Sequence, residues 1–166
     1  GLAFAVVYCV CSLGMGRYAD RNNRRNLIAG CCAVWSVMTA MCGMASGFWT
    51  LALARLGVAV GESGSGAASM SVIADLYQPA QRPKAISVFM LAPPIGTLLG
   101  LSVGAWITYY YGWREAFLWM AIPGLVAAVL LRLSGSEPQR GHWEAFHGGV
   151  DAVSYTHLRA HETGRN

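Results

Sequence analysis

Two charged residues, Arg55 and Glu62, stand inside a long apolar run that is rich in small residues, and they are the side chains of this sequence best placed to do chemistry. The run extends from Thr50 to Ala74. At about 1.5 Å of rise per residue it makes roughly 37 Å of helix, enough to cross a hydrocarbon core of about 30 Å. On this reading Glu62 lies near the middle of the membrane.

The seven-residue spacing of Arg55 and Glu62 places both on one helix face, roughly 10 Å apart. A charge at that depth costs on the order of 3 kcal/mol, so such groups normally face a bundle interior or a wet cavity and mark a functional site. Two structural alternatives stay open. Arg55 is close enough to one end of the run to reach the nearer interface, and Glu62 is also suited to be a hydrogen-bonding staple between helices.

The composition places the chain in a membrane. Of its 166 residues, 55% are hydrophobic and only 12% are charged, which is too apolar for an ordinary soluble domain. The formal charge of +4 does not indicate nucleic-acid binding, because the cations cluster at the ends of apolar runs. The five cysteines all lie within such runs and are interpreted as packing residues.

The apolar runs predict an all-α, polytopic membrane helix bundle over residues 1–134. Five spans are expected, and they cover residues 2–15, 27–44, 50–74, 85–109 and 113–133. The first is short, and no initiator Met precedes it, so we expect a span cut short at its start. Residues 135–151 are interpreted as the beginning of a cytoplasmic connection.

Positive charge is distributed unevenly between the predicted connections. One side of the bundle carries a single cation, Arg114, next to several aromatic residues. The other side carries eight, which are Arg17, Arg21, Arg24, Arg25, Arg82, Lys84, Arg132 and Arg140. The positive-inside rule therefore predicts that residues 16–26, residues 77–84 and the chain after Leu133 are cytoplasmic.

The first basic connection carries a recognisable motif. Gly16, Asp20, Arg21, Arg24 and Arg25 have the spacing G-x-x-x-D-R-x-x-R-R. This pattern resembles the signature that the major facilitator superfamily carries between its second and third helices. Asn23 stands where that signature usually has glycine, and Tyr18 where it commonly has leucine, but the charged frame is intact.

Further motifs extend this resemblance along the chain. They are Arg55-x-Gly57-x-x-x-Gly61-Glu62, Ala74-Asp75, Gly112-Trp113-Arg114 and Glu137-Pro138. Together they look most like the spinster-type branch, over about residues 1–150. The resemblance implies helices two to six of the amino-terminal six-helix half, so that the first helix and the second half of the same protein are expected partners.

The resemblance also implies a function. It predicts an incomplete amino-terminal half of a secondary active transporter, driven by a proton or ion gradient through alternating access, in a bacterial inner membrane. The solute implied is an amphiphile or an organic anion, with lysolipids and sphingoid phosphates associated with the spinster branch. No cofactor, metal or enzymatic activity is expected. The alternative class is a polytopic membrane protein that does not transport, such as an assembly factor or a membrane-embedded enzyme.

The resemblance assigns roles to particular residues. Arg55 and Glu62 are expected to serve transport and coupling. The motif residues Gly16, Asp20, Arg21, Arg24 and Arg25 are expected to form the cytoplasmic gate with Asp75, which should pair with Arg21 or Arg24.

Two glycine series predict close helix packing, since a four-residue spacing of small side chains lets helix backbones approach each other in lipid. One series lies in the run that carries Glu62, and the other in the next run. The glycines are Gly57, Gly61, Gly96, Gly100 and Gly104.

The end of the chain has a different character. Val153 to Thr163 resembles the translation of a transposon-end adapter used in sequencing libraries, so residues 152–166 are interpreted as an artefactual tail. His157, His161 and Glu162 have a metal-ligand spacing, but this interpretation rejects a metal site there.

Overall fold

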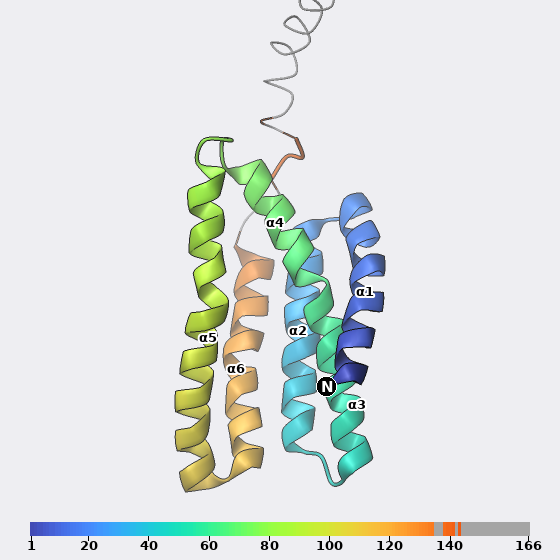
Figure 1. Ribbon diagram of the computed structural model, residues 1–166, viewed down its shortest axis with the longest axis vertical. Coiled ribbons are helices and arrows are strands. Elements are labelled where there is room, and N and C mark those ends of the chain that lie inside the picture. The colour runs from blue at the N-terminus through green and yellow to red at the C-terminus, as the bar shows by residue number, and fades with distance from the viewer. Residues whose placement is uncertain (135–137, 142, 144–166) are drawn as a thin grey trace, which may run out of the picture.

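The protein folds into a bundle of α-helices in the computed structural model, which describes residues 1–134, 138–141 and 143 (Figure 1). The predicted artefactual tail and its histidines lie outside these residues. The helices are α1 (Leu2–Arg21), α2 (Arg24–Gly43), α3 (Phe48–Ser63), α4 (Ser65–Leu76), α5 (Arg82–Tyr111) and α6 (Trp113–Leu133).

The helices confirm the predicted class of fold, an all-α membrane bundle. Four of them, α1, α2, α5 and α6, are each long and apolar enough to cross a membrane. The shorter α3 and α4 follow one another from one end of the bundle to the other (Figure 1).

The prediction of one continuous helix from Thr50 to Ala74 is wrong, because the helix is interrupted at Gly64. The hydroxyl groups of Ser63 and Ser65 donate to the carbonyls of Val60 and Glu62, at 2.7 and 2.9 Å. Serine and glycine are weak helix formers, and such local hydrogen bonds compete with the helical ladder. Glu62 therefore lies in the last turn of α3 and not in the middle of a helix.

The connection between the first two spans is shorter than the predicted loop over residues 16–26. Helix α1 continues to Arg21 and α2 begins at Arg24, so the motif is helical except for Asn22 and Asn23. The side chain of Asn23 caps α2 by accepting from the backbone N–H of Asn26 at 2.8 Å. Hydropathy marks where the apolar core ends, and helices continue past that point into the interface.

Helix α2 lies at the centre of the packing, between α3 on one side and α6 on the other. A Cβ atom at Gly61 would lie 2.6 Å from the backbone nitrogen of Trp35, and one at Gly57 would lie 2.5 Å from the sulfur of Met38. At these two glycines the helices approach each other closely, as their spacing leads one to expect. On the α6 side, a Cβ atom at Gly124 would clash with the hydroxyl group of Ser36.

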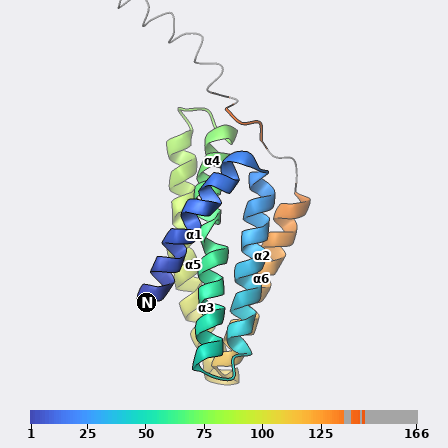
Figure 2. The ribbon, with the colours of Figure 1, turned by 90° about the vertical axis from the view of Figure 1, so that its right-hand side faces the viewer.

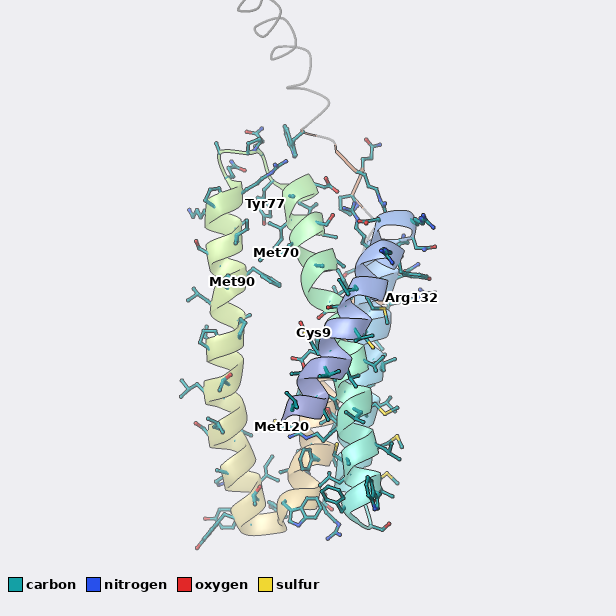
Figure 3. All side chains as sticks on the ribbon, turned by 45° about the vertical axis from the view of Figure 1, so that its right-hand side comes forward. Cys9, Met70, Tyr77, Met90, Met120 and Arg132 are labelled. Carbon is teal, nitrogen blue, oxygen red and sulfur yellow. The ribbon has the colours of Figure 1, made fainter. Side chains whose placement is uncertain are left out.

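For Gly96, Gly100 and Gly104 close packing stays a prediction, because no described helix meets them. No atom outside the local helix lies within 4 Å of a Cβ placed at any of them. Among the described helices α5 contacts only α6 and α4, and most of its residues, Met90 among them, are exposed (Figure 3). A small-residue series creates a packing surface but does not specify that the described helices occupy it.

The turns are divided between the two ends of the bundle. The α1–α2 and α4–α5 connections and residues 138–141 lie at one end, which we call the basic end, and the α2–α3 and α5–α6 connections lie at the other (Figure 1). At that other end Gly112 joins α5 to α6 with a φ of +93°, a conformation that favours glycine. All predicted cytoplasmic segments within the described residues therefore share one end.

Candidate functional site

A buried ion pair joins two helices at the basic end. The guanidinium of Arg24, at the start of α2, lies 2.5 Å from a carboxylate oxygen of Asp75 near the end of α4. The side chains of Arg24 and Asp75 are only 3% and 12% exposed. This is the contact predicted for Asp75, with Arg24 as the partner rather than Arg21.

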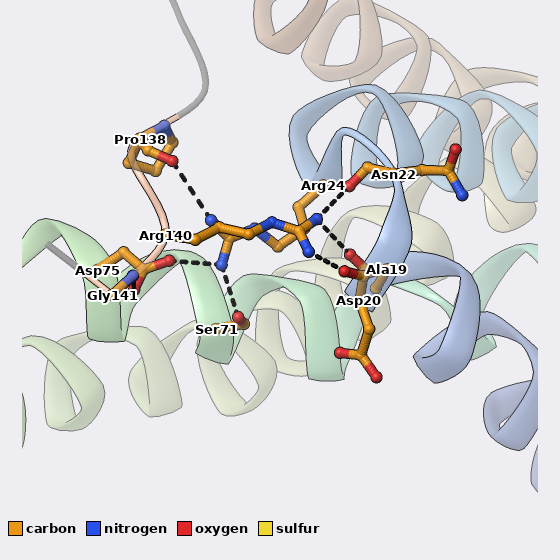
Figure 4. Close-up of polar contacts among 9 residues, drawn as sticks. All are labelled: Ala19, Asp20, Asn22, Arg24, Ser71, Asp75, Pro138, Arg140 and Gly141. Atoms are coloured by element: carbon orange, nitrogen blue, oxygen red, sulfur yellow. Dashed lines mark hydrogen bonds and ion pairs between the residues drawn. The ribbon is translucent and has the colours of Figure 1, made fainter. Parts of the chain in front are cut away.

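Further hydrogen bonds hold this pair in place (Figure 4). Arg24 also donates to the hydroxyl of Ser71 at 2.7 Å and to the carbonyl of Pro138 at 3.3 Å. The second carboxylate oxygen of Asp75 accepts from the backbone N–H of Gly141 at 3.0 Å. The chain after α6 thus completes the surroundings of both charged groups.

Arg140 ties the same segment to the end of α1. Its guanidinium donates to the backbone carbonyl of Ala19 at 2.7 Å and also to those of Asp20 and Asn22. The last carbonyls of a helix lack partners within the helix and carry partial negative charge, so a guanidinium is well suited to them. Residues 138–141 therefore fasten α1, α2 and α4 together, and we call Arg24, Ser71, Asp75, Arg140 and Gly141 the Arg24 cluster.

The other motif residues lie around the cluster without entering it. Asp20 and Arg21 are exposed, and the carboxylate of Asp20 points away from Arg24 (Figure 4). Gly16 is half-buried with open space beside its Cα, so no close approach requires glycine there. Arg25 is half-buried and donates to the side chain of Asn26 at 3.4 Å.

Three members of the cluster, Ser71, Arg140 and Gly141, were not predicted from the sequence. Ser71 lies one helical turn before Asp75 on the same face, so its spacing was an available signal. Arg140 was counted only as a cation of the connection, and Gly141 contributes a backbone group. No local sequence pattern predicts that Arg140, more than a hundred positions after α1, contacts the end of that helix.

Arg55 and Glu62 both lie on α3 and are both exposed. The guanidinium of Arg55 lies over the ring of Phe117 on α6, 5.5 Å from its centroid, a cation–π contact. Neither residue forms an ion pair within the described part of the chain, so the two are not paired with each other. The expected interior surroundings of these charges are thus absent from the described residues.

The described residues contain no group of three or more His, Cys, Asp or Glu side chains suited to a metal ion. Cys31, Cys32 and Cys42 are buried in α2 as free thiols, whereas Cys9 is exposed and Cys11 half-buried. The packing interpretation of the cysteines therefore holds for the three on α2.

The chain belongs to the Major Facilitator Superfamily, whose family model matches residues 1–161. Within that family it is similar to spinster proteins. It is 36% identical over 141 residues to human protein spinster homolog 1, covering 83% of this chain and 27% of that protein. It is also 35% identical over 133 residues to an MFS-type efflux pump of Mycolicibacterium smegmatis, covering 80% of this chain and 31% of the pump.

A solved structure shows the same arrangement of helices. A bacterial homolog of the human lysosomal transporter spinster, in an inward-facing and unoccupied conformation, matches with a TM-score of 0.73 and 32% identity. The match covers 85% of this chain and 35% of that structure. The chain therefore spans about a third of the length of the proteins that it resembles.

Proposed function

We propose that this chain is part of a secondary active transporter of an amphiphilic or organic-anion solute, working by alternating access with a proton or ion gradient in a bacterial inner membrane. Membership of the family supports this proposal, as does the similarity to an efflux pump and to a bacterial homolog of a lysosomal transporter. Transport, and no enzymatic reaction, is the function proposed.

The Arg24 cluster is the observation that carries the proposal. It joins the start of α2, the end of α4 and the end of α1 through one ion pair and a small set of hydrogen bonds. Contacts of this kind contribute a few kcal/mol, so a gate held by them can open and close again within a transport cycle. We assign to Asp75, Arg24 and the motif around them the role of a gate at the cytoplasmic side.

Coupling is assigned to Glu62, with Arg55 as the nearby cation on the same helix. In the proposed mechanism, the access of Glu62 to water and to Arg55 differs between the two states of the transport cycle. Coupling requires such a change between the two access states. The exposure of both residues leaves them open to solute and to the rest of the complete protein.

Proteoliposome uptake with the full-length protein tests the proposal. The panel of solutes contains a lysophospholipid, a sphingoid phosphate and a sugar acid, each measured with and without an imposed pH gradient. We expect at least one to accumulate faster than in empty liposomes and in proportion to the gradient. Uptake of all three at the rate of empty liposomes would contradict the proposed solute class.

A further inference from the structure

A wedge-shaped cavity lies between α1 and α2 on the outside of the bundle. The two helices meet at the Asn22–Asn23 turn and diverge from it, with α3 behind them (Figure 2). The cavity has a volume of about 550 Å³, within the range of about 300–1,000 Å³ that is typical of small-molecule sites. A ligand of ordinary size therefore has room between the two helices.

The lining of the cavity changes along its length. Near the turn it is polar, with the phenol of Tyr18 and three amide side chains, Asn22, Asn23 and Asn26. Farther from the turn it is apolar, and the residues there are Met15, Leu27, Gly30, Cys31, Val34, Val60 and Gly61. A ligand that fits this lining has a polar head and a hydrocarbon tail aligned with the membrane normal.

Several arginines lie beside the polar end, although none of them lines the cavity itself. Arg25 donates to the side chain of Asn26, and its Nε atom is buried without a hydrogen-bond partner. Arg132 lines a neighbouring groove together with Asn26 and Gly30. Arg17 and Arg21 are exposed on the last turns of α1. Arg24, by contrast, is already paired with Asp75.

We propose that the wedge binds an anionic phospholipid of the cytoplasmic leaflet. Its phosphate lies against the asparagine rim between Arg25, Arg132 and the cations of α1, and one acyl chain lies along Leu27, Gly30 and Val34. Basic pockets between membrane helices on the cytoplasmic side are suited to such headgroups, and the positive-inside rule assigns the basic end to that side. The lipid then braces the α1–α2 turn, whose next residue is Arg24.

This site does not depend on the proposed transport function, because a lipid can occupy the wedge whatever the protein moves. Its test is binding of dioleoyl phosphatidylglycerol and dioleoyl phosphatidylcholine to the full-length protein in detergent, measured by native mass spectrometry. We expect phosphatidylglycerol to bind more tightly, since only the headgroup differs. Equal affinity for the two lipids would overturn the proposal.

Two valines of α2 give a matched pair of variants. Val34 lines the wedge and is 42% exposed, whereas Val37, about one turn away, does not line it and is 45% exposed. Val34→Trp fills the cavity and is expected to weaken phosphatidylglycerol binding about tenfold, with Val37→Trp unchanged. If both variants bind as the wild type does, the wedge is not the site. If Val34→Trp alone unfolds the protein, another segment of the chain covers the wedge and the proposal fails.

Asn26→Asp tests the headgroup contact separately. A carboxylate in the first turn of α2 is favourable for the helix, so the fold should persist, but it repels a phosphate. We expect phosphatidylglycerol to bind about fivefold more weakly and phosphatidylcholine to bind as before. Unchanged binding of phosphatidylglycerol by this variant would contradict the assigned position of the phosphate.

Discussion

For Arg24, the sequence predicted the ion-pair partner but not the burial of the pair. Its motif predicted an ion pair with Asp75, and that pair forms. An ion pair exposed to solvent contributes only about 0.2–1 kcal/mol. The observed pair is buried. Removing one partner would leave the other charge buried without a counter-charge, and this would lower the stability of the fold by more than the loss of an exposed pair would.

Asp75→Asn should therefore weaken the fold of the full-length protein as well as alter its gating. The amide keeps the shape of the carboxylate but loses the charge that faces the guanidinium of Arg24. We expect a loss of stability on the order of 1–3 kcal/mol, measured as a lower denaturation midpoint in detergent. The control is Asp20→Asn, whose carboxylate is exposed at the same end and should be silent. Equal midpoints for the two variants would show that the Arg24 cluster does not stabilise the fold.

At the scale of helices, the sequence predicted which segments are helical better than it predicted their ends and contacts. Long apolar runs indicate spans because lipid forces backbone groups to bond within the segment. The break at Gly64 was missed because its cause is local, in the hydrogen bonds of Ser63 and Ser65. The glycine series looked alike on α3 and α5, yet only the first meets α2, and spacing alone carries no information about a partner.

Gly61→Ala tests the packing of α3 on α2. The added methyl group would lie 2.6 Å from the backbone nitrogen of Trp35 and 3.0 Å from the carbonyl oxygen of Cys31, and backbone atoms cannot move aside cheaply. We expect a loss of about 1–3 kcal/mol, seen as a lower thermal midpoint. Gly30→Ala is the matched control, because its methyl group meets nothing within 4 Å and alanine favours a helix. A stable Gly61→Ala variant would show that α3 and α2 are farther apart.

At the scale of the whole molecule, the charge asymmetry agrees with the arrangement of the turns. The connections that carry most of the cations meet at one end of the bundle, as the alternation of spans requires (Figure 1). The return of residues 138–141 to that end was beyond prediction, because it joins segments distant in sequence through backbone carbonyls and a single arginine. The orientation in the membrane remains a prediction from the positive-inside rule.

Labelling of single cysteines in intact cells tests this orientation. In a cysteine-free full-length protein, Asn22→Cys and Gln81→Cys should resist an impermeant thiol reagent added outside, because both lie at the basic end. Ser46→Cys, in the connection between α2 and α3, should react with it. All three positions are exposed, so accessibility on the protein surface does not decide the result. The reverse pattern of labelling would invert the topology.

The proposed role of Glu62 in coupling is tested by pH-gradient-driven uptake by the Glu62→Gln variant in proteoliposomes. Glutamine keeps the size and hydrogen bonding of Glu62 but cannot change its charge, so we predict normal folding with gradient-driven accumulation abolished. Glu115→Gln, an exposed carboxylate in the first turn of α6, is the matched control and should transport as the wild type does. If Glu62→Gln accumulates solute with the pH dependence of the wild type, Glu62 is not the coupling residue and the proposed mechanism is wrong.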